Sequence, residues 1–295
     1  MGAKRLIVVA GATGNQGGAV ARALSAARGW RVRGITRDPA KPESKELARL
    51  GVEMVKADLY DRASLDSALK GAHGVFSVQN FWTEGYEGEV RQGRNLAAAA
   101  KAAGAEHFVY SSVGGADRNS GLPHFESKWE IEAHLRSLGL PTTVVRPVFF
   151  MDNFNGPNFQ PGLLEGKLPV ALDPETKLQM IAVEDIGAFV AMAFGKPEQF
   201  MGKAMEIAGD ELTMPETAAA FTKAMGLKVE FVQQDIGEVR RANAEWAKML
   251  EWFDAAGYEA DIPALRSLHP KLLAFEQWLA KSEGARAGKQ AAAAR

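Results

Sequence analysis

The glycines in the segment AGATGNQGG, residues 10–18, have the spacing of a phosphate-binding turn. Gly11, Gly14 and Gly17 follow the apolar run at 6–10 and precede the helix-forming segment 19–27. A glycine turn between a strand and a helix lets the backbone approach a ligand closely. The unpaired N–H groups and the dipole at the start of the helix attract a pyrophosphate. The pattern therefore predicts dinucleotide binding.

The residues after the second expected strand indicate which dinucleotide binds. An acidic side chain there holds the ribose 2'-hydroxyl of NAD, whereas the 2'-phosphate of NADP needs a basic one. The segment TRDPAK supplies Arg37 and Lys41, which predict a preference for NADP(H). Asp38 complicates this prediction, because its charge would either repel a phosphate or accept a ribose hydroxyl. The alternative for these charged residues is a polar surface loop. After the third strand, Asp58 or Leu59 is a candidate neighbour of the adenine, and a solvated loop is the alternative.

Composition and charge exclude several classes of protein. The 295 residues are 46% hydrophobic, enough for a full core. A formal net charge of −1 offers no field for nucleic acid or an anionic membrane. No apolar stretch of about 18 residues and no signal peptide are visible, so we expect a cytoplasmic protein. The chain has no cysteine, and its histidines lack metal-ligand spacing, so redox chemistry would need a bound cofactor.

Apolar runs alternate with helical patterns through the first half of the chain, which is typical of a doubly wound parallel sheet. We predict an α/β, Rossmann-type fold with an NAD(P)-binding domain over residues 1–150. A smaller α/β lobe over 151–281, interleaved with the last sheet strands, would serve a substrate or a partner. Residues 282–295 have low complexity; we expect a flexible tail there, with a helical extension as the alternative.

One helical segment of the smaller lobe carries an apolar stripe. In residues 238–257 the apolar side chains of the stripe are Trp246, Met249, Leu250 and Phe253. Core packing of the smaller lobe is the interpretation we favour. The alternatives are a cover over a substrate cleft and the contact surface of a homodimer.

Five motifs in order resemble the NmrA-like group of atypical short-chain dehydrogenases: GATGNQGG, TRDPAK, QNFW, HFESKWEIE and MIAVEDIG. The resemblance spans roughly residues 4–280 and implies a Rossmann-type fold with NADP(H) as cofactor. It leaves the activity open, because the group contains both reductases and regulators. The partner implied is therefore either a small-molecule substrate or a regulatory protein.

The resemblance also implies which residues meet the cofactor and the substrate. Those at the pyrophosphate are Gly11, Thr13, Gly14, Asn15, Gln16 and Gly17, and those at the 2'-phosphate are Arg37 and Lys41. Those beside the nicotinamide and its ribose are Gln79, Asn80, Phe81, Lys128, Phe149, Phe150 and Asn153. An apolar substrate would lie among Trp82, Phe149 and Met151, with core packing as the alternative for the aromatic residues.

The catalytic residues of the parent superfamily are only partly present. Lys128 has the lysine position of the YxxxK motif, but His124 stands where the tyrosine would donate a proton. None of the four tyrosines has a lysine four residues later, which excludes the usual mechanism. Lys128 or His124 would then donate the proton, since histidine is suited to this near neutral pH. Ser112 would polarise the substrate oxygen, or else cap a turn.

Two functions remain open at this point. In the first, which we favour, NADPH reduces a small carbonyl, enone or quinone substrate. In the second, the protein is a non-catalytic NADP(H) redox sensor in which Lys128 only binds the ribose. Cofactor occupancy would then order a loop that a partner protein recognises.

Overall fold

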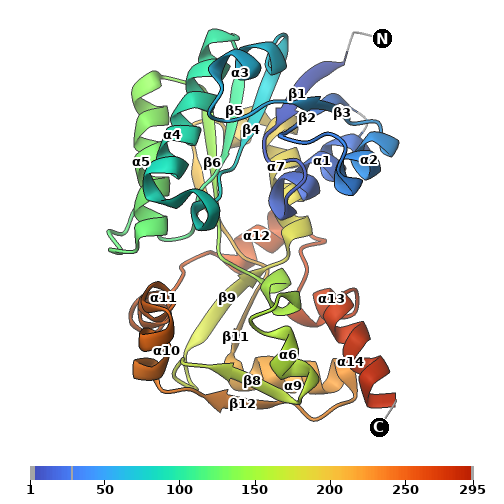
Figure 1. Cartoon of the computed structure of the whole chain (residues 1–295), viewed down its shortest axis with the longest axis vertical. Coiled ribbons are helices and arrows are strands. Elements are labelled where there is room, and N and C mark those ends of the chain that lie inside the picture. Colours follow the sequence, from blue (N-terminus) through green and yellow to red (C-terminus); the bar gives the residue numbers. More distant parts are fainter. Residues whose placement is uncertain (1–3, 28, 294–295) are drawn as a thin grey trace. The chain divides into compact units, whose positions relative to one another are not determined.

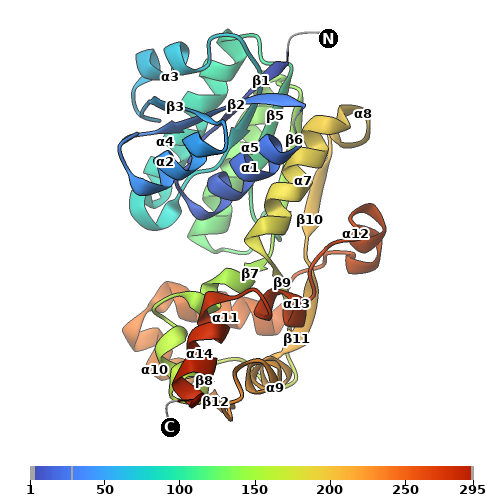
Figure 2. The ribbon, with the colours of Figure 1, turned by 90° about the vertical axis from the view of Figure 1, so that its right-hand side faces the viewer.

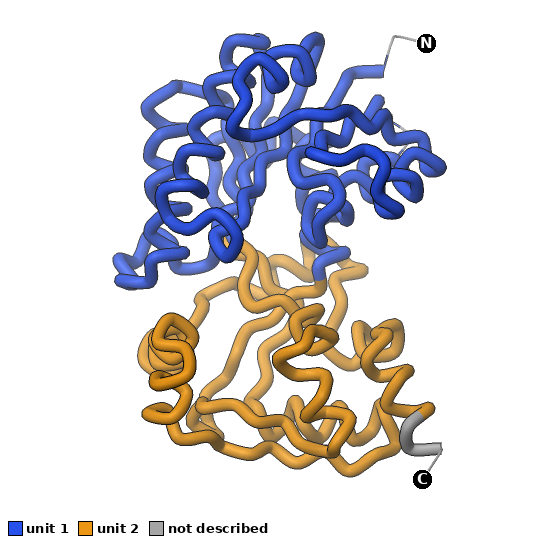
Figure 3. The backbone as a smooth tube through the Cα atoms, in the orientation of Figure 1, with its two compact units in different colours: residues 1–146, 183–205 blue, residues 147–182, 206–295 orange. Residues whose placement is uncertain are grey.

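The computed structural model describes residues 4–27 and 29–293. The chain forms two compact units (Figure 3): residues 1–146 with 183–205, and residues 147–182 with 206–295. The first unit thus ends four residues before the predicted boundary after residue 150, and the segment 183–205 returns to it.

A seven-stranded sheet forms the centre of the first unit (Figure 1). Its strands are β1 Arg5–Val9, β2 Trp30–Thr36, β3 Glu53–Lys56, β4 Ala72–Ser77, β5 His107–Ser111, β6 Thr142–Pro147 and β10 Ala204–Ile207. The order across the sheet is β10-β6-β5-β4-β1-β2-β3, and the pairs from β6 to β3 are parallel. The chain reverses its direction of winding between β1 and β4, and ligands of α/β sheets bind at such a switch point.

Helices cover both faces of this sheet (Figure 1). One face carries α3 Arg62–Ala68, α4 Phe81–Ala102 and α5 Pro123–Leu138; the other carries α1 Asn15–Ala26, α2 Pro42–Arg49 and α7 Val183–Gly195, which α8 Pro197–Phe200 follows. Helices α1 and α7 lie side by side (Figure 2), because Gly187 brings its Cα close to the carbonyl of Ala19. The structure confirms the predicted doubly wound α/β fold.

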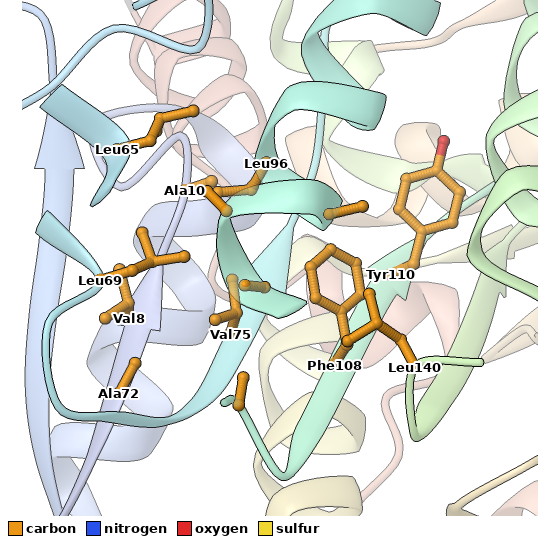
Figure 4. Close-up of a cluster of buried hydrophobic side chains, with 14 of the residues drawn as sticks. Val8, Ala10, Leu65, Leu69, Ala72, Val75, Leu96, Phe108, Tyr110 and Leu140 are labelled. Carbon is orange, nitrogen blue, oxygen red and sulfur yellow. The ribbon is translucent and has the colours of Figure 1, made fainter. Parts of the chain in front are cut away.

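The core under α3, α4 and α5 explains the uninterrupted apolar runs of the strands (Figure 4). Val8, Val75 and Phe108 come from three neighbouring strands and have no exposed surface. Strands covered on both faces need apolar side chains at successive positions. Full burial of each large side chain contributes about 1.5–3 kcal/mol, so the sheet is a rigid base for the loops at its edge.

The second unit contains smaller sheets and several short helices. A three-stranded sheet has the order β11-β9-β7, and β12 pairs with β8. The strands are β7 Phe149–Phe150, β8 Lys167–Val170, β9 Lys177–Ile181, β11 Asp210–Thr213 and β12 Glu230–Gln233. The helices are η1 Met151–Asn155, α6 Gln160–Leu164, α9 Met214–Met225, α10 Ile236–Ala242, α11 Ala244–Ala255, α12 Ile262–Leu268, α13 Phe275–Leu279 and α14 Glu283–Ala293.

The apolar stripe of residues 238–257 packs into the core of the second unit. Met249, Leu250 and Phe253 on α11 are buried. The ring of Trp246 lies 6.2 Å from that of Phe159, measured between centroids. Core packing, the interpretation favoured from the sequence, is therefore confirmed.

Helix α14 corrects the expectation of a flexible tail at 282–295. Residues 283–293 are helical, and residues 294–295 lie outside the described part of the chain. Asn155 Oδ1 accepts hydrogen bonds from Ser282 Oγ and the Gly284 N–H at the start of the helix. Ala285 is buried, and a Cβ at Gly288 would lie 2.1 Å from Met225 Cε. Ala285 and Gly288 let α14 approach its neighbours closely because both residues are small.

Candidate functional site

The glycine turn has the geometry that a pyrophosphate needs. Gly11 has φ +61°, a conformation that favours glycine. A Cβ at Gly17 would lie 2.2 Å from the carbonyl oxygen of Gly11, so only glycine fits there. Gly14 caps α1 without a side-chain hydrogen bond, and the first turn of α1 contains no acidic residue. The helix therefore presents its N–H groups and its positive dipole end beside the switch point, which fits the phosphates of a dinucleotide.

The other predicted residues of this turn differ in exposure and in their contacts. Thr13 is half-buried and Asn15 is exposed. The carboxamide oxygen of Gln16 accepts a hydrogen bond of 2.6 Å from Ser111 Oγ at the end of β5. Gln16 therefore fixes the turn to the sheet, and its contact with the cofactor stays a prediction.

The loop after β2 carries the basic residues that predict NADP(H). The side chain of Arg37 is 73% exposed, and its Nη1 lies 3.9 Å from Glu84 Oε1. Lys41 is exposed at the start of α2. Asp38 Oδ1 accepts a hydrogen bond of 2.9 Å from the Ala40 N–H. The Asp38 carboxylate therefore closes its own turn, and the acidic neighbour of Arg37 is Glu84.

The candidates for the adenine lie after β3. Asp58 Oδ1 accepts a hydrogen bond of 2.9 Å from the Tyr60 N–H, and the carbonyl of Leu59 accepts one from Asn95 Nδ2. Both residues are half-buried. Their contact with the adenine stays a prediction.

Two buried polar side chains leave neighbouring strands at the carboxyl edge of the sheet. Gln79 follows β4 and Ser112 follows β5, and the register pairs Ser77 with Tyr110 just before them. Gln79 Nε2 donates to Ser77 Oγ, but its Oε1 is buried without a hydrogen-bond partner in the described part of the chain. Ser112 Oγ is also buried without a hydrogen-bond partner in the described part of the chain. Ser112 therefore does not cap a turn through its hydroxyl, and both atoms have unused hydrogen-bonding capacity.

The predicted loop QNFW is shorter than expected, because α4 begins at Phe81. Asn80 is the N-cap of this helix, and its Oδ1 accepts a hydrogen bond of 3.0 Å from the Trp82 N–H. Phe81 is half-buried, whereas Trp82 is 61% exposed. The asparagine side chain ends the loop early, since a capped helix start is favourable.

His124 lies in an aromatic pocket of the first unit. Its ring centroid is 5.2 Å from that of Trp82 and 5.7 Å from that of Phe81. His124 Nδ1 is buried without a hydrogen-bond partner among the residues that the structure describes. Burial, and then the positive charge of Lys128, lower the pKa of His124 to about 4. This corrects the expectation of an acid near neutral pH, because the imidazole is neutral at pH 7.

Lys128 forms a buried ion pair that the sequence analysis missed. Lys128 Nζ donates to Glu89 Oε1 at 2.7 Å, and the other oxygen of Glu89 accepts a short hydrogen bond from Ser127 Oγ. Glu89 has no exposed surface, and the Lys128 side chain is 14% exposed. A carboxylate removed from water needs such partners. Glu89 therefore determines where the ammonium group of Lys128 lies.

The spacing of α4 contains the signal that would have located Glu89. Glu89 is followed at helical intervals by Gly93, Leu96, Ala97 and Ala100, all of which are buried. This spacing puts the carboxylate on the apolar face of the helix. A Cβ at Gly93 would lie 2.7 Å from Ile131 Cδ1, so α4 and α5 approach closely there. A charged residue on an apolar helix face predicts a buried partner.

Four predicted site residues belong to the second unit. Phe149 is buried in that unit and packs against the rings of Phe154, Phe159 and Phe253. Phe150 is half-buried, Met151 is fully buried and Asn153 is exposed. The positions of these residues beside a nicotinamide or a substrate stay predictions.

The described part of the chain lacks two further features. No helix in the described ranges is long and apolar enough to cross a membrane. In the same part of the chain, no three His, Cys, Asp or Glu side chains are grouped so that they could hold a metal ion.

The parallel sheet with a glycine turn at its switch point defines the class of Rossmann-type proteins. Within this class, the family model of the NmrA-like family matches residues 3–279. The chain therefore belongs to the NmrA-like family, which confirms the resemblance found in its motifs. An NmrA-like family domain-containing oxidoreductase of Aspergillus hancockii is 32% identical over 251 residues, which cover 77% of this chain and 74% of that protein.

Solved structures of the same fold include an enzyme and a regulator. The NADPH-dependent quinone oxidoreductase of Escherichia coli, complexed with NADPH, is 26% identical with a TM-score of 0.78, covering 93% of this chain and 99% of that chain. NmrA, a negative transcriptional regulator in complex with NADP, is 21% identical with a TM-score of 0.79, covering 98% of each chain. The likeness to NmrA at this identity concerns the fold alone.

Proposed function

We propose that this protein is an NADP(H)-dependent reductase of small apolar carbonyl, enone or quinone compounds. The observation that carries the proposal is that three predicted site residues are among those with a buried polar atom that lacks a hydrogen-bond partner in the described part of the chain: Gln79 Oε1, Ser112 Oγ and His124 Nδ1. Buried polar atoms without hydrogen bonds are costly unless a ligand satisfies them. They occur in the unit that contains the glycine turn. The NADPH complex of the quinone oxidoreductase and the oxidoreductase relative support the same reading.

The glycine turn would hold the pyrophosphate of NADP(H), and Arg37 with Lys41 would bind the 2'-phosphate. When bound, the reduced nicotinamide supplies a hydride. Lys128 Nζ already donates one hydrogen bond to Glu89, which leaves two N–H donors for the ribose hydroxyls. Glu89 and Ser127 would keep this ammonium group in place while the substrate is exchanged.

The substrate oxygen that gains negative charge would accept hydrogen bonds from the Ser112 hydroxyl and the neutral imidazole of His124. Neither group needs to give up its proton, because the anion of a hydroquinone or enol is stable enough to take one from water. A quinone or enone therefore suits this site better than an isolated ketone, whose strongly basic alkoxide needs a proton donor that acts as the hydride is transferred. The exposed ring of Trp82 offers an apolar surface for such a substrate.

The alternative is a non-catalytic NADP(H) sensor that acts through a protein partner. It is favoured by one observation: His124, in the place of the proton-donating tyrosine, is neutral and buried. In this role Lys128 binds the ribose only, and Trp82 provides an exposed aromatic contact for a partner protein.

One experiment separates these functions. Oxidation of NADPH by the purified protein is followed by nicotinamide absorbance against a panel of quinones, enones and aldehydes, and cofactor binding is titrated in the same samples. Lys128→Gln keeps a hydrogen bond to Glu89 and should lower turnover more than tenfold. Lys101→Gln is the matched control, because Lys101 near the end of α4 is exposed and donates to the Leu138 carbonyl at the end of α5.

Turnover that depends on Lys128 would establish the reductase and its substrate class. Selective binding of NADPH without turnover of any acceptor would favour the sensor. If the protein binds neither NADPH nor NADP, both proposals are wrong.

A further inference from the structure

Glu84 stands beside the arginine that is predicted to bind the 2'-phosphate. We propose that Glu84 is a cofactor-specificity residue: its carboxylate competes with the 2'-phosphate for Arg37 and thereby limits the preference for NADP(H) over NAD(H). The inference rests on the proposed binding of NADP(H). It adds a residue that neither the glycine turn nor the basic loop after β2 contains.

The carboxylate of Glu84 is held in this position. Its Oε1 lies 3.9 Å from Arg37 Nη1, and its Oε2 accepts a hydrogen bond of 2.9 Å from Tyr60 Oη. The Glu84 side chain is 17% exposed. The guanidinium of Arg91 lies over the Tyr60 ring, 5.2 Å from its centroid. Gly88 leaves the space for the phenol, since a Cβ there would lie 2.6 Å from Tyr60 Oη.

The Glu84 carboxylate, fixed beside Arg37, should affect the binding of the two cofactors differently. The 2'-phosphate of NADP(H) brings a second negative group to the same guanidinium, and like charges repel. The 2'-hydroxyl of NAD(H) is neutral and can donate a hydrogen bond to a carboxylate. Because the Arg37 side chain is 73% exposed, water and salt weaken the repulsion. Glu84 should therefore weaken NADP(H) binding moderately and leave NAD(H) binding nearly unchanged.

The test compares nucleotide affinities in isosteric variants. NADPH and NADH are titrated by calorimetry at low ionic strength against the wild type and Glu84→Gln, whose amide oxygen still accepts from Tyr60. We expect NADPH to bind about two- to fivefold more tightly to Glu84→Gln, and NADH affinity to stay within error. Added salt should shrink the gain. Glu87→Gln is the control, because Glu87 is exposed on the same helix and has no ion pair with Arg37 in the described structure.

A second background tests whether the effect depends on Arg37. In Arg37→Ala the wild-type preference for NADPH should fall, and Glu84→Gln should restore little of it. If the wild type binds NADPH but Glu84→Gln gives no gain, or no more than Glu87→Gln, the role of Glu84 is refuted and the proposed function stands. A wild type that binds no nucleotide would refute the proposed function itself.

Discussion

The phosphate-binding turn at residues 11–17 and the ion pair of Lys128 with Glu89 both lie in the first unit, but they differ in construction. The turn consists of consecutive residues, and its geometry depends on the space that glycines leave to the backbone. The pair joins two helices across 39 residues, and the carboxylate is fully removed from water. Added side-chain volume should therefore disturb the turn, whereas removal of one of the two charges should disturb the ion pair.

The largest effect is expected when the buried pair loses one partner. Lys128→Ala leaves Glu89 without a counter-charge, and the free energy of unfolding should fall by about 3–5 kcal/mol. Replacing both residues, by Lys128→Met with Glu89→Leu, should recover most of this loss because no charge stays buried. Urea unfolding measures both variants.

The control for this prediction is an exposed ion pair between the same helices. Arg94 Nη2 lies 2.7 Å from Glu130 Oε1, with side chains 49% and 35% exposed. Arg94→Ala should cost only about 0.2–1 kcal/mol. Equal losses for Lys128→Ala and Arg94→Ala would show that burial does not distinguish the two pairs.

A smaller effect is expected from added volume in the turn. A Cβ at Gly17 would lie 2.2 Å from the Gly11 carbonyl oxygen and 2.7 Å from that of Ala10. Because both neighbours are backbone atoms, Gly17→Ala should lower the free energy of unfolding by about 1–3 kcal/mol and weaken NADPH binding. Gly14→Ala, with a nearest approach of 3.3 Å, should cost less stability. Loss of NADPH affinity without loss of stability would contradict the steric explanation.

The smallest effect concerns pH and the neutral imidazole beside Lys128. The pKa of His124 is lowered to about 4, from 6.5 for an exposed histidine. Between these values only the unfolded chain binds the proton, so the free energy of unfolding falls as the pH drops from 6.5 towards 4. Between pH 7 and pH 5 His124 should contribute about 1–2 kcal/mol to this fall.

Urea unfolding of His124→Gln at pH 7 and pH 5 checks this prediction. The free energy of unfolding of the variant should fall less between the two pH values, because the variant lacks the contribution of His124. Burial, and then the charge of His73, lower the pKa of His107 to about 4 as well, so part of the pH dependence should remain. An unchanged pH dependence in His124→Gln would show that His124 is not held neutral in the folded protein.

Local patterns were sufficient for the fold and for half of the candidate site. The apolar runs predicted the strands of the first unit, and the glycine spacing predicted the turn at the start of α1. The low complexity of 282–295 suggested a flexible tail, but alanine is a strong helix former and small residues permit close packing. Here α9 and Asn155 provide the contacts that make the segment helical.

By itself, the sequence determined the doubly wound sheet, the glycine turn, the basic residues after β2 and the missing YxxxK tyrosine. These features follow from the types and spacing of neighbouring residues, whose backbone preferences are local. Only the tertiary structure decided that Glu89 holds Lys128, that Glu84 stands beside Arg37, and that His124 is neutral. Those properties depend on distances between segments and on exclusion of water, which result from packing rather than from spacing along the chain.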